Sequence, residues 1–160
     1  MTRLARIFVI AAAVAVCVVV IAPVRAAEIK VHSTAVHVNM PSGSEKLDDG
    51  RTLVHANDKA VVQDTDPNSP LNLATRNCYG TMIMDAKGNL VDGAGYCETF
   101  DKANDVYWLT WNMAPGGGVK WNAFHGTGKF EGVTGSGDTK VIAWSPDRYV
   151  ITSEGTLSIK

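Results

Sequence analysis

The last strand-like segment of the chain shows a regular alternation of apolar and polar side chains. In YVITSEGTLSI, residues 149–159, the side chains of Tyr149, Ile151, Leu157 and Ile159 fall on one face of an extended chain, and polar side chains take the other. Similar short runs occur at residues 29–39, 51–57, 59–63, 77–84, 91–100, 105–112, 119–125 and 138–144, separated by turn residues. No helix-period segment of useful length follows residue 27. Eight or nine strands in one small domain predict an all-β fold, a single eight-stranded (eight to nine) antiparallel barrel.

The N-terminal residues have the layout of a secretory signal. The basic start MTRLAR precedes the apolar run IFVIAAAVAVCVVVIA, and PVRAA then offers a cleavage point after Ala26. An uncleaved membrane anchor is the alternative, although the run is shorter than the ~20 residues that a spanning helix needs. We therefore expect a signal peptide at residues 1–26, a β-barrel domain at residues 27–160, and a periplasmic or secreted protein.

Composition narrows the range of partners. Without the signal, 134 residues remain, with 12 Lys and Arg against 16 Asp and Glu, a formal net charge of −4. No basic cluster survives, which argues against a nucleic acid partner. No segment of the mature chain is apolar enough to span a bilayer, so no membrane partner is expected after cleavage. The sequence leaves the number of subunits open, a homo-oligomer included.

Two cysteines remain in the mature chain, Cys78 and Cys97. An exported protein with two cysteines most simply pairs them. The segment AKGN predicts a tight hairpin turn centred on its Lys-Gly pair. In that register, the numbers of two residues that face each other add up to 175. Cys78 and Cys97 meet this condition, so they are expected to face each other across the hairpin. A plain two-residue turn makes this the wider, hydrogen-bonded type of pair, and a bulge near Gly93 or Gly95 would correct the fit. We predict a disulfide; two free buried thiols are the alternative.

The stretch HGTGKFEGVTGSG, residues 125–137, holds five glycines, so we compared it with the motifs of phosphate-binding loops. A phosphate loop requires Ser or Thr after its Gly-Lys pair and a helix to follow, whereas Phe130 follows Lys129 here. The dinucleotide pattern also fails, because the third glycine is one residue too far. Glycines at a strand end permit positive φ and sharp coiling of the sheet. We then expect Phe130 to fill the end of the barrel and Lys129 to be a solvated side chain. The predicted structural glycines are Gly126, Gly128, Gly132 and Gly135.

This glycine stretch also carries a family resemblance. Together with the turn SPDR and the final strand containing EGTLSI, it resembles the G-G-T-G-x-[FY]-x-G-x-x-G region of the dirigent and allene oxide cyclase barrels, and is most similar to small exported bacterial proteins with that barrel. The resemblance covers residues 77–160, with His125 in place of the first glycine. It implies an eight-stranded antiparallel barrel with a mostly apolar cavity. It supports the fold rather than an activity, because the catalytic residues of those families have no counterpart that we can place here. The matching positions are Gly126, Thr127, Gly128, Phe130, Gly132 and Gly135.

Glu98 is the best candidate for acid/base catalysis. Its face of the central hairpin is rich in aromatic side chains, and if that face points inward, the apolar setting favours the protonated carboxyl group and suits it to proton transfer. The alternative, which we favour, is a solvated glutamate on the outer face. Tryptophans could also line a pocket. The candidate pocket residues are Tyr79, Tyr96, Phe100, Trp108, Trp111 and Trp144.

No metal or cofactor site is predicted. His32 and His37 lie five residues apart on one strand and so point to opposite faces, and no H-x-H or H-E-x-x-H spacing occurs. The segment DKAND, residues 101–105, lacks the later glutamate of a calcium loop and predicts a hairpin turn. No G-x-S-x-G motif signals a nucleophile.

The function that the sequence favours is non-catalytic. We expect an exported barrel that holds a small apolar or aromatic molecule in its cavity. One alternative is a cyclase or isomerase that acts in the same cavity with Glu98 as acid/base. Another is a protein-binding or inhibitory barrel whose loops make the contact.

Overall fold

The computed structural model of the chain describes residues 26–40, 42–114, 118–145 and 147–160. The predicted signal peptide lies outside these ranges except for its last residue, Ala26, and the first strand begins directly after it, at Ala27. Within the described ranges, no helix is long and apolar enough to cross a membrane.

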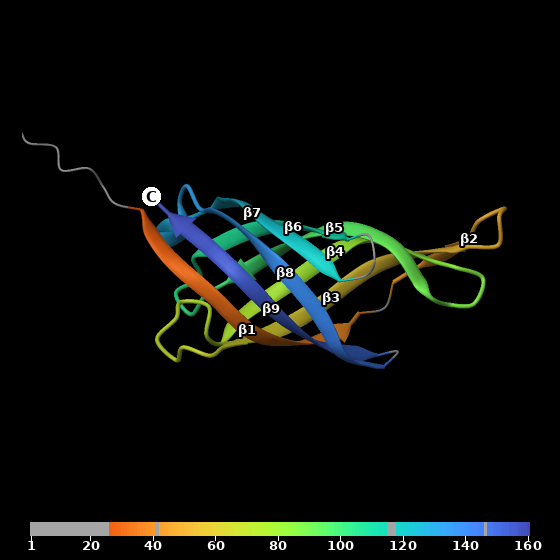
Figure 1. Cartoon of the computed structure of the whole chain (residues 1–160), viewed down its shortest axis with the longest axis horizontal. Coiled ribbons are helices and arrows are strands. Elements are labelled where there is room, and N and C mark those ends of the chain that lie inside the picture. Colours follow the sequence, from red (N-terminus) through yellow and green to blue (C-terminus); the bar gives the residue numbers. More distant parts are fainter. Residues whose placement is uncertain (1–25, 41, 115–117, 146) are drawn as a thin grey trace, which may run out of the picture.

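Nine strands and one short 3₁₀ turn make up the described chain (Figure 1). Their bounds are β1 Ala27–Asn39, β2 Ser44–Lys46, β3 Thr52–Asp64, β4 Ala74–Met84, β5 Leu90–Phe100, β6 Val106–Met113, β7 Val119–Gly126, η1 Gly128–Phe130, β8 Thr134–Ser145 and β9 Arg148–Ile159. Every pair of neighbouring strands is antiparallel.

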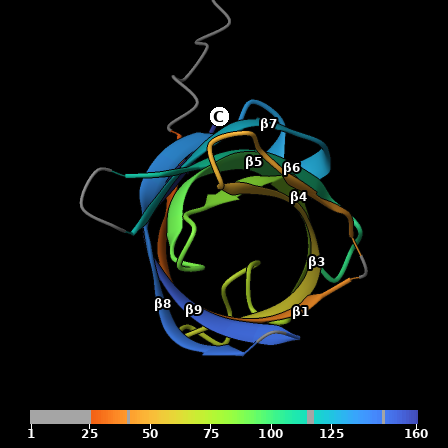
Figure 2. The same cartoon turned by 90° about the vertical axis from the view of Figure 1, so that its right-hand side faces the viewer.

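Eight of these strands close into a barrel. From β3 to β9 each strand pairs with the next along the chain, and β1 pairs with both β9 and β3, which closes the ring. Figure 2 views this ring end-on. The short strand β2 pairs only with the start of β3 and lies outside the ring, at the end of the molecule where β3 and the β4–β5 turn project (Figure 1). The predicted all-β antiparallel barrel is confirmed.

Besides shifts of a few residues at several strand ends, two segments differ in kind from the sequence prediction. Residues 51–57 and 59–63 are parts of one strand, β3, because the charged Asp58 that separates them is buried in the wall of the barrel rather than placed in a turn. The loop at residues 40–50 contains the short strand β2, whose three residues are all exposed and so show no apolar alternation.

The hairpin of β4 and β5 has the predicted pairing through a different turn. Asp85 N–H donates to the carbonyl of Asn89, and Gly88, at φ 84°, closes a three-residue turn. Met84 pairs with Leu90 and Ile83 with Asp92, so Val91 is an extra residue in β5. This shift gives the register in which paired residue numbers add up to 175, as for Cys78 and Cys97. The bulge is therefore at Val91, and the expected site at Gly93 or Gly95 is wrong. Its effect is the expected one, because the cysteine Cα atoms lie 4.1 Å apart, the spacing of the narrow pair.

The disulfide between Cys78 and Cys97 is present, as predicted. Both residues are buried and face the barrel interior, in the layer that also contains Leu109 of β6. Because it joins adjacent strands, the bond fixes the register of β4 against β5. That register decides which side chains of the central hairpin point inward.

One end of the barrel is filled by apolar side chains. Phe130 is fully buried there and packs against Tyr107, with ring centroids 5.2 Å apart. Gly126 allows this close approach, since a Cβ on it would lie 2.2 Å from the carbonyl oxygen of Phe130. Gly128 takes a positive φ of 56°. The buried residues around Phe130 include Leu71, Val133 and Leu157.

Lys129 is more than a solvated side chain. Its ammonium group lies 2.5 Å from the carboxylate of Asp101, which is buried, and 3.9 Å from that of Asp105. Asp101 Oδ1 also accepts hydrogen bonds from the backbone N–H groups of Ala103 and Asp105, which shapes residues 101–105 into the predicted hairpin turn. The lysine therefore ties the glycine stretch to the β5–β6 turn.

Candidate ligand cavity

The barrel encloses a cavity of about 600 Å³. Alternate residues of the strands point into it, as the two-residue period of extended chain requires. Its depth is lined by buried residues such as Val31 and Leu109, and its outer part by exposed ones, among them Val141 and Trp144. Three tryptophans and four methionines contribute to a mostly apolar surface: Trp111, Trp121, Trp144, Met40, Met82, Met84 and Met113.

The predicted pocket residues divide between the two sides of the wall. Trp111 and Trp144 line the cavity. Tyr79, Tyr96, Phe100 and Trp108 lie on the outer face instead, because their chain neighbours Cys78, Cys97, Thr99 and Tyr107 are the buried, inward-facing residues of the same strands. The aromatic side chains pair outside the barrel, with Tyr79 and Tyr96 ring centroids 5.4 Å apart.

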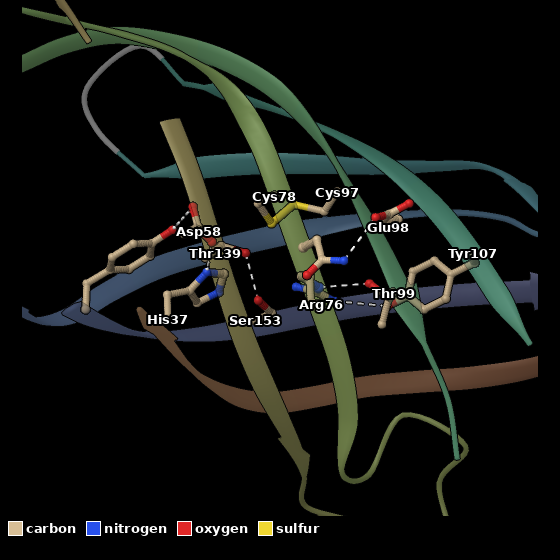
Figure 3. Close-up of a disulfide and its surroundings, with 12 residues drawn as sticks. His37, Asp58, Arg76, Cys78, Cys97, Glu98, Thr99, Tyr107, Thr139 and Ser153 are labelled. Atoms are coloured by element: carbon tan, nitrogen blue, oxygen red, sulfur yellow. Dashed lines mark hydrogen bonds and ion pairs between the residues drawn. A yellow bond between two sulfur atoms is a disulfide. The ribbon is translucent and has the colours of Figure 1, made fainter. Parts of the chain in front are cut away.

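Glu98 occupies the outer face as well. It pairs across the strands with Asn77 and Trp108, and its carboxylate accepts a hydrogen bond from Asn77 Nδ2 at 3.0 Å. Figure 3 shows Glu98, with this hydrogen bond dashed, near the disulfide. Glu98 is not among the residues that line the cavity, so acid/base chemistry on an enclosed molecule would need other groups.

A cluster of three polar side chains interrupts the apolar lining. His37 of β1 and Asp58 of β3 are buried, with Nδ1 and Oδ1 2.5 Å apart, and the hydroxyl of Tyr149 on β9 donates to Asp58 Oδ2 at 2.9 Å. The His37 ring also stacks on Tyr149, with centroids 4.5 Å apart. Burial, together with the charge and hydrogen bond of Asp58, raises the pKa of Tyr149, so its hydroxyl keeps its proton.

The hydrogen bonds of this cluster determine its chemistry. A carboxylate offers only acceptors, so Asp58 accepts hydrogen bonds from the Nδ1–H of His37 and from the Tyr149 hydroxyl. With Nδ1 bound to Asp58, Nε2 is the ring nitrogen left for other contacts, and within the described chain it has no hydrogen-bond partner. The arrangement of a carboxylate that orients an imidazole is one that general acid/base catalysis uses.

A second polar group lies on the neighbouring strand β4. Arg76 is buried and lines the cavity, and it donates from Nε to Thr99 Oγ1 at 2.9 Å and from Nη2 to the hydroxyl of Tyr107 at 3.0 Å (Figure 3). On the opposite side, Thr139 and Ser153 share a buried hydrogen bond of 2.8 Å. The cavity thus combines a large apolar surface with a few fixed polar groups, which is the usual composition of a small-molecule site.

One group of side chains has the composition of a metal site. Ligand atoms of His37, Asp58 and Cys78 lie within 4.8 Å of one another. The sulfur of Cys78 is bonded to Cys97, so it offers no thiolate while the disulfide is intact. His37 and Asp58 already bind each other, and the set does not fit a zinc centre of three or four ligands.

The sequence carries a weak signal for one of these polar groups, His37. Along residues 31–37, the positions that alternate on one face end at His37, which places this histidine on the inner side of its strand. Asp58 and Arg76 have no such signal, because a charged residue within an alternating pattern predicts a turn or a solvent-exposed position. Their burial follows from barrel closure, which brings β1, β3 and β4 side by side.

Comparison with known proteins shows a similarity of fold. No protein-family model matches the chain, and no curated protein matches it. The structure of the pterocarpan synthase dirigent protein GePTS1 is similar with a TM-score of 0.54 at 13% sequence identity, over 84% of this chain and 89% of that one. The pterocarpan synthase dirigent protein PsPTS1 is also 13% identical, over 83% and 94% of the two chains, with a TM-score of 0.29.

The chain is therefore a dirigent-like antiparallel β-barrel with an internal cavity. This agrees with the resemblance carried by the glycine stretch. At 13% identity the likeness defines the architecture, and the functional argument has to come from the cavity itself.

Proposed function

We propose that this protein is an exported binding barrel that holds a small apolar or aromatic molecule in its cavity. The observation that carries the proposal is the 600 Å³ cavity, which reaches from exposed apolar residues at its mouth to buried ones at its base. A space of this size falls within the range of ligand pockets, and its lining of tryptophan and methionine side chains suits an apolar body.

Export is part of the same proposal. The predicted signal peptide and the Cys78–Cys97 disulfide both favour a periplasmic or secreted protein, because disulfides persist in oxidising compartments. N-terminal sequencing of the exported protein should give AEIKVH, the start of β1. An intact Met1 in the exported fraction would contradict this part of the proposal.

Native mass spectrometry of the protein purified from its own host tests the binding function. We expect an added mass that is released on denaturation, from a small molecule of low polarity. A substitution that fills the cavity, Met82→Trp, should remove the added mass, whereas the same change on the outer face of the same strand, Thr81→Trp, should retain it. An added mass that both variants keep would place the ligand elsewhere.

The His37–Asp58 pair favours a second candidate function, a cyclase or isomerase that moves a proton on the enclosed molecule. His37 Nδ1 is held by Asp58, and Nε2 has no partner within the described residues. This geometry replaces Glu98 as the acid/base candidate for a reaction in the cavity. In deuterated water the co-purified molecule should then acquire deuterium in the wild type and in Glu98→Gln, and lose this exchange in His37→Gln. Equal exchange in all three proteins would contradict proton transfer by His37.

A further inference from the structure

Arg76 is the only buried Lys or Arg in the described chain. The guanidinium group lines the cavity, and its position in the wall is set by pairing of Arg76 with Ala60 of β3 and Thr99 of β5. We propose that Arg76 binds a carboxylate, so that the ligand of the barrel is an apolar monocarboxylate. This inference rests on the proposed binding function and adds the chemical class of the ligand.

The hydrogen-bond partners of Arg76 carry no charge. Thr99 Oγ1 and the Tyr107 hydroxyl are neutral acceptors, and they use the Nε and Nη2 groups. Within the described ranges, Arg76 forms no ion pair with a carboxylate, and Nη1 has no hydrogen-bond partner. A guanidinium group carries five N–H donors and stays charged at any pH a protein meets, so donors and a full positive charge remain available at the cavity surface.

Neither buried carboxylate of β3 forms a direct ion pair with Arg76. Asp58 lies on the adjacent strand β3, and its two oxygens accept from His37 and Tyr149. The other buried carboxylate of β3, Asp64, accepts from the backbone of Asp66 and does not line the cavity. A buried charge is costly unless it is paired. An anion brought in with the ligand would supply a direct ion-pair partner.

The geometry suits a carboxylate in particular. A guanidinium group presents parallel N–H donors that match the two oxygens of a carboxylate, and such pairs are the stronger kind of hydrogen bond. Thr99 and Tyr107 bind the guanidinium group from one side (Figure 3). These two hydrogen bonds orient its parallel N–H donors, which act as a fork, before the ligand binds. The remaining lining, which includes Trp111 and Met82, accommodates an apolar body. An acid of one to a few rings satisfies both requirements.

A matched pair of probes tests this inference. 2-Naphthoate and 2-naphthamide share the same ring system and nearly the same shape, and only the first carries a charge. Calorimetric titration of the wild-type protein at pH 7 should show at least tenfold tighter binding of the naphthoate. Equal affinity for the two probes, or tighter binding of the amide, would overturn the inference while leaving an apolar binding cavity in place. If neither probe binds the wild type, the binding function itself fails, and the inference with it.

Substitutions then assign the preference to Arg76. Arg76→Met should lose the preference for naphthoate while it still binds naphthamide, and Arg76→Lys should keep a weakened preference because it retains the charge without the fork. Arg148→Met removes an exposed arginine at the start of β9 and should leave the preference intact. A preference that survives Arg76→Met would contradict the assignment. The wild-type comparison and the Lys variant remain decisive if Arg76→Met does not fold.

Discussion

Asp58 on β3 lies directly opposite Cys78 on β4, so a buried carboxylate and the disulfide of the barrel share one level of the wall. His37 and Tyr149 reach the same carboxylate from β1 and β9. Side chains from β1, β3 and β9 thus meet at one polar cluster, at the level of the disulfide on β4. The polar cluster connects β1, β3 and β9 at the place where their pairing closes the ring.

Asp58→Ala should strongly destabilise the barrel. The substitution leaves the Nδ1 proton of His37 and the Tyr149 hydroxyl without an acceptor, and loss of one member of a buried pair costs about 3–5 kcal/mol. Urea denaturation should show this decrease in the free energy of unfolding. The matched control is Glu98→Ala, which breaks a hydrogen bond to Asn77 on the outer face and should cost about 1 kcal/mol or less. Similar costs for the two variants would contradict the placement of Asp58.

The disulfide should contribute on the order of 3 kcal/mol through the entropy of the unfolded chain, because it closes a loop with a sequence separation of 19. Reductant should lower the free energy of unfolding of the wild type by this amount, and the urea midpoint should fall with it. The double variant Cys78→Ala/Cys97→Ala should show the lower midpoint under all conditions and no response to reductant. Two thiols that titrate in unfolded, unreduced protein would show that the bond is absent.

Gly128→Val should cost more than Gly50→Val. Both glycines have positive φ, 56° and 85°, a conformation that costs other residues about 1–2 kcal/mol. A Cβ at Gly50 has open space, whereas one at Gly128 would overlap the carboxylate of Asp105. Thermal unfolding of the two variants separates the backbone effect from the steric effect. Equal changes in melting temperature would contradict the close contact between η1 and the β5–β6 turn.

The Asp101–Lys129 pair predicts a specific dependence of stability on pH. Burial by itself raises the pKa of Asp101, but hydrogen bonds from Lys129, Ala103 and Asp105 outweigh it and lower the pKa below its ordinary value. A group with a lowered folded-state pKa stabilises the protein above the unfolded value of about 3.9, and this contribution is lost as the pH falls through the folded value. The difference in stability between the wild type and Asp101→Asn should therefore be largest near neutral pH and shrink below about pH 4.

Lys129→Ala provides the companion variant for this pair. Because the lysine side chain is 43% exposed, solvent screens the interaction, and the cost should be about 0.5–1 kcal/mol at pH 7. This exceeds the effect expected for a fully solvated lysine. The variant should also weaken the pH dependence assigned to Asp101. An unchanged pH profile in Lys129→Ala would contradict the role of the lysine in lowering the Asp101 pKa.

The architecture could be predicted from the sequence because it depends on local pattern. The alternation in residues 149–159 predicts a strand with one apolar face, and Ile151 and Leu157 are indeed buried. The cavity surface depends on longer-range geometry. A bulge at Ile142, where Val141 pairs with Ile151 and Ala143 with Val150, turns that residue to solvent, although simple alternation groups it with Trp144. The sequence does not determine which face of the central hairpin points into the barrel, since both of its faces are rich in apolar groups.

The account as a whole depends on a cavity that takes up an apolar molecule, and titration with the neutral fluorophore N-phenyl-1-naphthylamine tests this most directly. We predict a saturable rise in emission with one site per chain in the wild type and in Thr81→Trp, and loss of this rise in Met82→Trp, whose indole fills the cavity. An absence of saturable binding to the wild type, or binding that is unchanged in Met82→Trp, would contradict the central claim.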